Sequence, residues 1–418
     1  MSQAVAVETE NSGNRTWAAL KKIGPAFVSA TTIFGPASLL LAALAGALYR
    51  YSLMWVVVLV LVERLVYFEM GTRLGIMMPH HLLTTASRTY NNKWIGIVGG
   101  IVSFLSSAPY AAGNVLGCSL AAQLLLGGNL VVWAIGFMIA AVLIFFFRGV
   151  YQRLEKIALI MVALMLVTFL ATLAFSGFSA GEAAKGLIPG AMAAPPLLLA
   201  ISIFSTNQSA MGFTQVYFVR GKKYTPKDLK DARFDHILSS VLLSVITAAI
   251  MAVGAEVLNP AGIVPTSAPQ AARMLEPLVG SGAKILFGLG LFGAAFTSLS
   301  GHPVLNGITL GDAFQRADAG ADSRFAKITA SALVIVMGLF GILPVAFGWQ
   351  AINIYWICAL GGLIGYPFRG IIALSLAKRK DIMKDLAFNK TYFKFLVAFF
   401  VVILGFVIYS SLKNLGVF

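Results

Sequence analysis

The sequence contains eleven apolar runs, most of them about as long as a helix that crosses the hydrocarbon core of a bilayer. They cover residues 23–49, 53–68, 95–126, 130–147, 157–175, 196–219, 237–257, 285–310, 328–347, 352–377 and 395–412. With 59% hydrophobic and 11% charged residues, a soluble fold of 418 residues has too little interior for these side chains. The sequence therefore predicts an all-α integral membrane protein with eleven transmembrane helices.

The basic residues predict how these helices are oriented. If the N-terminus is cytoplasmic, 24 of the 31 Lys and Arg side chains fall in cytoplasmic segments and five fall outside. Basic loops stay on the cytoplasmic side, so this asymmetry predicts a cytoplasmic N-terminus and contact with anionic membrane lipid. The formal charge of +15 is thus explained by topology, and no basic face with interleaved aromatics indicates a nucleic-acid partner. The compact loops predict the inner (plasma) membrane of a prokaryote.

The first apolar run is interrupted near its middle by Gly35-Pro36. Proline lacks a backbone donor and clashes with the preceding turn, and glycine adds backbone freedom, so the helix is predicted to break there. Non-helical backbone at such depth persists only inside protein or beside a water-filled cavity. A simple proline kink is the alternative.

A second interruption lies in the sixth run, where residues 205–212 read Ser-Thr-Asn-Gln-Ser-Ala-Met-Gly. Two breaks, each opening a block of five segments, indicate an inverted repeat with a binding site near the midplane. We expect a disordered cytoplasmic tail over residues 1–20 and one transmembrane domain over 21–418. Within that domain, the repeats are predicted at about 23–176 and 187–378, with an extra helix at about 393–412.

Several polar side chains fall inside the apolar runs. Adjacent Glu63 and Arg64 are interpreted as partners of neighbouring helices, because charges at depth are costly unless they are paired. Asn114 requires a specific partner, and His302 is interpreted as an interior histidine rather than a proton carrier. Arg369 is predicted to extend to the cytoplasmic surface.

The order of four motifs resembles the natural-resistance-associated macrophage protein (Nramp) family of metal transporters. The motifs are residues 35–38 continuing to 51–55, and residues 151–156, 215–220 and 293–298, and the resemblance spans residues 20 to about 410. It implies a LeuT-type fold, with eleven segments, two inverted five-helix repeats and broken helices 1 and 6. It also implies proton-coupled uptake of divalent transition metals such as manganese and iron.

The chain departs from the family at the positions that the resemblance assigns to metal. The family's first break reads Asp-Pro-Gly-Asn, and its Asp and Asn correspond here to Gly35 and Ser38. The family's Met-Pro-His in the sixth segment falls on Gln208, Ser209 and Ala210. None of these side chains is anionic or a thioether, so the metal ligands remain unknown and transition-metal selectivity is in doubt.

The positions that the resemblance assigns to proton carriers are neutral as well. Two acids of the family's third segment fall near Ala111 and Asn114, and a histidine of its sixth segment falls near Gln215. Asn114 and Gln215 are therefore predicted only as a polar pathway, and proton coupling has no evident carrier.

Three hypotheses remain open. The protein is a weakly selective divalent-cation transporter, a transporter of another small polar or anionic solute, or a membrane receptor or scaffold. For the first, the predicted substrate-binding residues are Gly35, Ala37, Ser38, Thr206, Asn207 and Gln208. An enzyme is not expected, because no paired acids, nucleophile or cofactor loop occur at membrane depth, and no cofactor is predicted.

Overall fold

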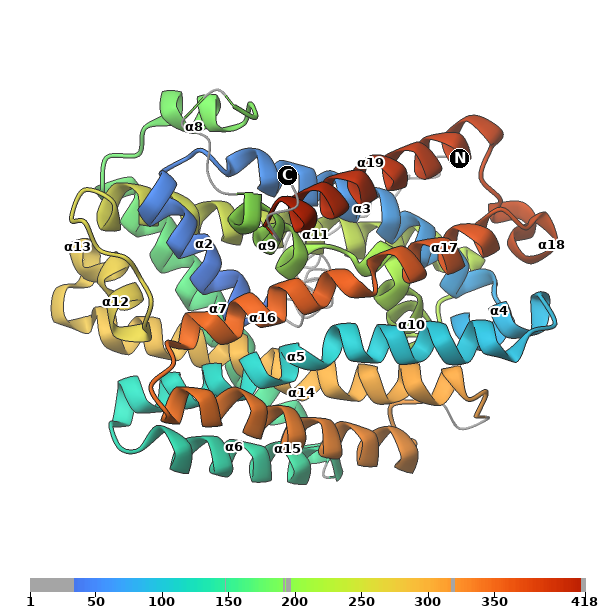
Figure 1. The fold of residues 1–418 in the computed structure, drawn as a ribbon, viewed down its shortest axis with the longest axis horizontal. Helices are drawn as coiled ribbons and strands as arrows, with labels where there is room; N and C mark the ends of the chain where they lie inside the picture. The colour runs from blue at the N-terminus through green and yellow to red at the C-terminus, as the bar shows by residue number, and fades with distance from the viewer. Residues whose placement is uncertain (1–33, 147, 191, 193–196, 317–319, 415–418) are drawn as a thin grey trace, which may run out of the picture.

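The computed structural model describes residues 34–146, 148–190, 192, 197–316 and 320–414, and every regular element in these ranges is helical (Figure 1). The predicted segments correspond to α2 (Pro36–Tyr49), α3 (Met54–Met77), α5 (Lys93–Leu126), α6 (Leu130–Phe146), α7 (Arg148–Phe175), α9 (Leu197–Asn207) with α10 (Phe213–Gly221), α11 (Leu229–Val253), α14 (Ala283–Ala313), α15 (Arg324–Ala346), α16 (Ala351–Ile364) with α17 (Tyr366–Ala377), and α19 (Lys390–Asn414). Short helices α4 (Leu82–Thr89), α8 (Ala180–Gly186), α12 (Ala268–Ala272), α13 (Glu276–Val279) and α18 (Lys380–Met383) lie between them.

Several of the helices have the length and apolar character that a bilayer requires. In the described part of the chain, six spans are long and apolar enough to cross a membrane, or seven when the bent pair of α7 and α8 counts as one. The predicted end of the second segment at residue 68 is wrong, because α3 continues to Met77. Its last turns are stable despite their charges because Arg73 Nε donates to Glu69 Oε1 over 2.6 Å.

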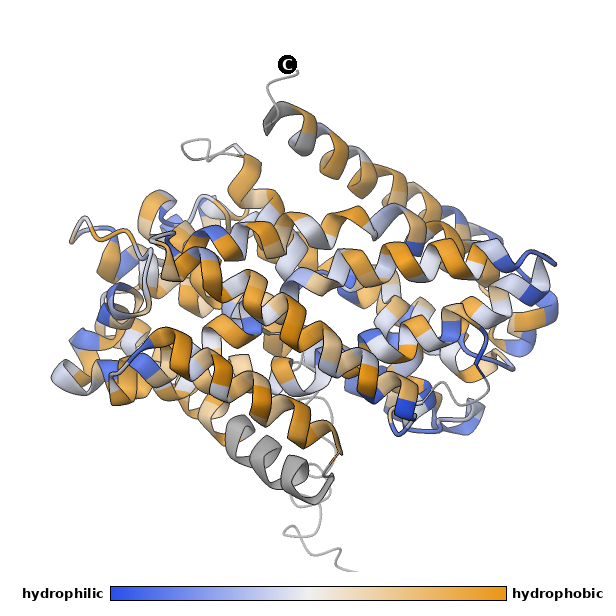
Figure 2. Cartoon of the chain, turned by 60° about the horizontal axis from the view of Figure 1, so that its bottom comes forward, coloured by the Kyte–Doolittle hydropathy of each residue, from blue (hydrophilic) through white to orange (hydrophobic). Residues whose placement is uncertain are grey.

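The long helices run roughly side by side, with mostly hydrophobic residues along their length and more hydrophilic residues toward the ends of the molecule (Figure 2). Helix α5 packs along α14 and also contacts α15 and α16, while α3 packs against α10 and α11. Helix α2 lies against α11. The middle of the molecule is therefore surrounded by α2, α5, the α9–α10 pair and α14.

The predicted break in the sixth segment is present between α9 and α10. Three successive residues, Ala210, Met211 and Gly212, have φ values of 52°, 60° and 68°. A Cβ on Gly212 would lie 2.0 Å from the carbonyl oxygen of Tyr67 on α3. Glycine is therefore required at this position both for its left-handed backbone and for the close approach of α3.

Two adjacent charged residues of α3 hold this break in place. The Ser209 amide donates to Glu63 Oε2 over 2.8 Å, and the Ser209 hydroxyl donates to Glu63 Oε1 over 2.7 Å. Arg64 Nη1 donates to the Asn207 carbonyl over 3.2 Å. Both charged side chains are fully buried, so their structural interpretation is supported by specific contacts to the broken backbone.

The first segment is described only from Phe34 onward. Helix α2 begins at Pro36, in the middle of the apolar run, and Gly35 precedes it in an extended conformation. The first half of the predicted broken helix and the predicted disordered tail lie outside the described residues. Ser38 of α2 donates its hydroxyl proton to the Thr206 carbonyl over 3.0 Å, so the start of α2 contacts the end of α9.

A third bend separates α16 from α17 at Gly365. The Gly365 amide donates to Ser106 Oγ of α5 over 3.0 Å, and Arg369 Nη2 donates to the same oxygen over 2.5 Å. The expectation that Arg369 reaches the cytoplasmic surface is wrong, because only 6% of this residue is exposed and its guanidinium turns inward toward α5.

Candidate functional site

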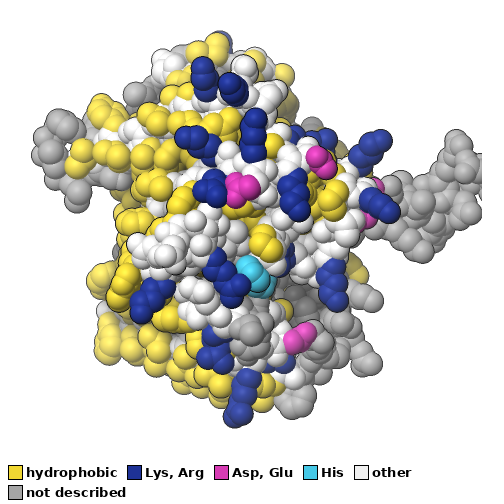
Figure 3. Space-filling model, turned by 90° about the vertical axis from the view of Figure 1, so that its right-hand side faces the viewer, with side chains coloured by type: hydrophobic (Ala, Val, Ile, Leu, Met, Phe, Trp, Pro, Cys, Tyr) yellow, Lys and Arg dark blue, Asp and Glu magenta, His cyan; other side chains and the backbone are white. Residues whose placement is uncertain are grey.

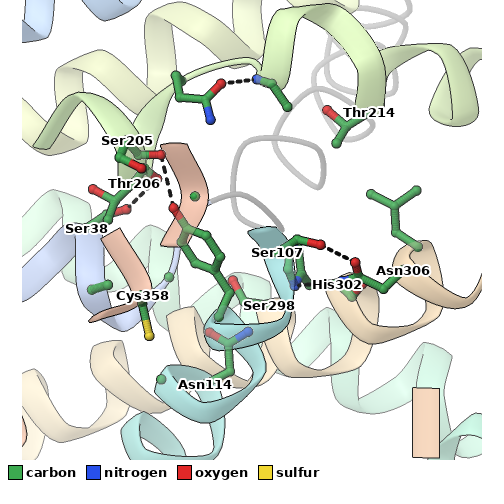
Figure 4. A pocket seen from close by; sticks show the side chains of 18 of the residues that line it. Ser38, Ser107, Asn114, Ser205, Thr206, Thr214, Ser298, His302, Asn306 and Cys358 are labelled. Carbon is green, nitrogen blue, oxygen red and sulfur yellow. Dashed lines mark hydrogen bonds between the residues drawn. The ribbon is translucent and has the colours of Figure 1, made fainter. Parts of the chain in front are cut away.

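A polar cavity of about 110 Å³ lies where the start of α2, the α9–α10 break and the α16–α17 bend meet α5 and α14. Side chains with hydroxyl and amide groups from these elements point into it (Figure 4). Because an ordered water requires roughly 10–15 Å³ of such space, the cavity has room for a small solute or for an ion with part of its first shell of water.

Most of the predicted site residues line this cavity. Gly35, Ala37 and Ser38 reach it from α2, Thr206 and Gln208 from the α9–α10 region, and Asn114 from α5. These residues are distant in sequence, and the two interrupted segments bring them together. A Cβ on Gly35 would lie 3.3 Å from Asn114 Oδ1, which shows how closely α2 approaches α5 here.

Two predicted residues are not among the residues that line the cavity. Asn207 Nδ2 donates to the Ile203 carbonyl over 2.9 Å, and its Oδ1 accepts from Thr247 Oγ1 of α11 over 3.2 Å. Gln215 Nε2 donates to Thr72 Oγ1 of α3 over 3.2 Å. Both amides instead connect neighbouring helices.

The backbone carbonyls freed by the α9–α10 break already accept protein hydrogen bonds. The Ser205 carbonyl accepts from Tyr110 Oη over 3.1 Å, the Thr206 carbonyl from Ser38 and the Asn207 carbonyl from Arg64. Carbonyl oxygens at a broken helix are common ligands for cations. Their use by protein donors leaves the cavity with fewer strong acceptors.

The start of α2 offers backbone amide donors rather than carbonyl acceptors. Pro36 has no amide hydrogen, and the amides of Ala37 and Ser38 have no intrahelical acceptor because they belong to the first turn. The Gly35 carbonyl accepts from the Leu39 amide over 3.3 Å, as the first bond of the helix. The helix therefore presents amide donors and its positive dipole end in this region.

Several residues that line the cavity were not predicted as site residues. They include Ser103 and Ser107 of α5, His302 and Asn306 of α14, and Arg369 of α17. Ser107 Oγ donates to Asn306 Oδ1, and Asn306 Nδ2 donates to the His302 carbonyl over 3.0 Å. The signal for them was the small polar cluster at 103–107 and a histidine in the middle of an apolar run, both of which equally fit helix packing.

The described lining contains no Asp, Glu or Met. Cys358 and His302 contribute a thiol and an imidazole, but the thiol donates to the Pro109 carbonyl over 2.9 Å. No group of three or more His, Cys, Asp or Glu in the described ranges is arranged to hold a metal ion. An inner-shell site for a transition metal is not formed by these residues.

The lining extends toward one end of the molecule. Phe218 and Thr309 line the cavity near the ends of α10 and α14, which lead into the loops that begin at residues 222 and 314. Figure 3 looks onto this end, where many Lys and Arg side chains gather and few acidic ones do. This is the end that the charge asymmetry predicts to be cytoplasmic.

The other end is closed by tight packing between α2 and α11. A Cβ on Gly46 would lie 2.0 Å from the Met251 carbonyl oxygen. Tyr51 Oη donates to Glu256 Oε1 over 2.7 Å, and Asn259 Nδ2 donates to the Ala47 carbonyl over 2.7 Å. Backbone contact and partly buried hydrogen bonds thus hold α2 against α11 and the loop after it at this end, which we call the sealed end.

Comparisons with known proteins agree with this architecture. The divalent metal cation transporter MntH of Vibrio campbellii is 26% identical over 318 residues, which are 72% of this chain and 74% of that protein. The manganese transporter of Eremococcus coleocola, solved with an aromatic bis-isothiourea substituted compound, superposes with a TM-score of 0.78 at 16% identity. That match covers 97% of this chain and 89% of the other.

A more distant structure shares the fold. A nucleobase-cation-symport-1 family transporter in a closed conformation superposes with a TM-score of 0.55 at 14% identity, covering 93% of this chain and 92% of the other. The fold is thus of the LeuT type, and the described part of the chain is helical with a break between α9 and α10. Residues 26–413 match the family described as natural resistance-associated macrophage protein-like. The family model and the relatives show a multi-pass membrane transporter rather than an enzyme. The chain therefore belongs to the Nramp family of metal transporters.

Proposed function

We propose that this protein is a secondary transporter that carries a small hydrophilic solute through the central cavity. The single observation that carries the proposal is the meeting of the α2 start and the α9–α10 break around a polar cavity. In transporters of this type, rocking of one helix bundle against another exposes such a midplane site alternately to each side.

The first candidate cargo is a divalent cation that keeps part of its water shell. Family membership favours a divalent cation. The described cavity provides hydroxyl and amide oxygens but no carboxylate or thioether, and neutral oxygens do not repay the loss of tightly bound water. A cavity of about 110 Å³ has room for several waters, so a bound ion can keep part of its first shell. Selection of manganese or iron over magnesium is therefore not expected.

The second candidate cargo is a small anion, which is favoured by the buried Arg369 guanidinium and by the amide end of α2. Proton exchange at the third and sixth segments is not part of the proposal, because Ala111, Asn114 and Gln215 are neutral. His302 is the titratable imidazole in the described lining.

We further propose that the N-terminus and the basic end of Figure 3 face the cytoplasm, in the inner (plasma) membrane of a prokaryote. We also infer that residues 21–418 form one transmembrane unit made of two inverted repeats and α19. Thiol labelling of single cysteines placed in the loops at residues 222 and 280 tests the orientation: only the second should react from outside.

The transport proposal is tested by uptake into proteoliposomes. Magnesium, manganese, acetate and lactate are screened with wild type and with Asn114→Leu, which replaces a cavity-lining amide by apolar methyl groups of similar size. Gln123→Leu is the matched control, because Gln123 lies on the same helix but bonds the Gly128 carbonyl away from the cavity. Loss of uptake in Asn114→Leu alone is expected. Equal uptake by both variants, or no uptake of any solute by wild type, contradicts the proposal.

A further inference from the structure

The Arg369 guanidinium is buried beside the central cavity without an acidic partner. It lines the cavity, is 6% exposed, and its Nη2 bonds Ser106 of α5. Its Nε makes no hydrogen bond. None of the ion pairs among the described residues includes Arg369, unlike Arg73 and Arg233 at the basic end, which share Glu69.

The hydrogen bond that joins α17 to α5 satisfies only part of the Arg369 guanidinium. The bond to Ser106 ties α17 to α5, and it uses one guanidinium nitrogen. A positive charge withdrawn from water is costly unless an anion or several acceptors compensate it. A guanidinium that lacks such compensation and borders a polar cavity is arranged to receive a negative group from that cavity.

Other groups around the cavity favour the same charge. Ser103 Oγ is buried, lines the cavity and has no hydrogen-bond partner. The first turns of α2 and α10, helices of 14 and 9 residues, contribute cavity-lining residues, so two positive helix ends border it. The carbonyl oxygens at the end of α9 already accept hydrogen bonds from protein donors. The cavity therefore offers more donors than acceptors.

We propose that Arg369 binds a small carboxylate anion in the central cavity. The planar fork of the guanidinium matches the two oxygens of a carboxylate. Nε and the Ser103 hydroxyl are buried and have no hydrogen-bond partner, so a small adjustment of the cavity wall would let both donate to the same anion. The inference rests on the proposed function, because it names the ligand class of the same transport cavity. The bound anion neutralises Arg369, so a hydrated cation would enter a cavity that no longer repels it.

The test measures anion binding to the purified full-length protein in detergent. The readout is the shift in melting temperature in metal-free buffer. Sodium acetate is titrated against sodium chloride at constant ionic strength. We expect acetate to raise the melting temperature and chloride to have little effect. Arg369→Gln should weaken acetate binding roughly 10- to 100-fold, the loss of a charge-assisted hydrogen bond. Arg369→Lys should weaken it less, because the charge remains without the fork.

Two more variants keep the test decisive if Arg369→Gln does not fold. Ser103→Ala should fold normally and weaken acetate binding several-fold. Arg273→Gln is the control, since Arg273 is exposed and its Nε bonds Glu276 in the loop region at the sealed end. Equal stabilisation by chloride and acetate, or unchanged acetate binding in both Arg369→Lys and Ser103→Ala, overturns the proposal.

The two proposals fail separately. Acetate binding that depends on Arg369, with no solute entering proteoliposomes, supports the anion site and contradicts the transport function. Uptake of magnesium that Asn114→Leu abolishes, with no acetate binding to wild type, supports transport and overturns the anion site.

Discussion

Removal of the Glu63 carboxyl group is expected to destabilise the break between α9 and α10. Its two oxygens accept the amide and the hydroxyl of Ser209, over 2.8 and 2.7 Å, and the side chain is fully buried. A hydrogen bond to a charged group contributes about 1.5–3 kcal/mol, and removal of one member of a buried charged pair costs about 3–5 kcal/mol. Because Arg64 loses its neighbouring acid, Glu63→Ala should lower the free energy of unfolding by about 3–5 kcal/mol.

A double-mutant cycle with Ser209 isolates this contact from other effects of the substitutions. Ser209→Ala removes only the hydroxyl, which donates to Glu63 and accepts from the Gly212 amide over 3.2 Å. It should cost about 1–3 kcal/mol, and in the double variant the two effects should fall short of additivity by about 1–2 kcal/mol. Unfolding in mixed micelles with increasing dodecyl sulfate, followed by circular dichroism, measures each value.

The control for this cycle is Glu276→Ala. Glu276 lies in the loop region at the sealed end, is 47% exposed and pairs with Arg273, so its removal should change stability by less than about 0.5 kcal/mol. Effects of Glu63→Ala and Ser209→Ala that add within about 0.5 kcal/mol would refute the account, because residues in direct contact must be coupled. A cost for Glu63→Ala as small as that of Glu276→Ala would refute it as well.

Three further variants test other parts of the structure. Gly212→Ala should lower the free energy of unfolding by about 2–4 kcal/mol through its positive φ and the contact with α3, and an unchanged thermal melt contradicts this. Asp312→Ala deprives the amides of Leu83 and Thr84 and the Tyr217 hydroxyl of their acceptor, at a cost of about 3–5 kcal/mol. Amide hydrogen exchange in α4 should become faster in Asp312→Ala, and unaltered exchange there contradicts this prediction. Gly35→Asp combined with Ser38→Asn should create manganese binding measurable by calorimetry, and its failure to bind would mean that the family positions are misassigned here.

Both positions could be predicted, because proline cannot continue a helix from a preceding turn and a run of polar residues is unusual at membrane depth. Gly35-Pro36 marks the start of α2, and the polar run at 205–212 contains the α9–α10 break. The adjacent charges of α3 were predictable as structural because burial of an unpaired ion is costly. Their targets, Ser209 for Glu63 and the Asn207 carbonyl for Arg64, are more than 140 residues away and could not be read from local sequence.

The composition of the cavity was harder to predict, because it depends on which way each side chain turns. Asn207 and Ser205 are neighbours in the same polar run, yet Asn207 turns toward α11 while Ser205 lines the cavity. Arg369 lies near the predicted end of its apolar run, where an arginine usually extends to the surface. The bend at Gly365 instead directs it toward Ser106. Gly365 and Pro367 favour a bend at this point of the sequence, but they do not indicate which way it turns Arg369.

Our central claim is that no side chain of the cavity binds a transition metal directly, and that uptake of the solute is not coupled to proton movement. The most direct measurement is manganese and magnesium uptake into proteoliposomes that contain a pH-sensitive dye, with and without an inward proton gradient. The account predicts that manganese enters no faster than magnesium and that the internal pH does not fall during uptake. Uptake that strongly prefers manganese and is accompanied by internal acidification would contradict it.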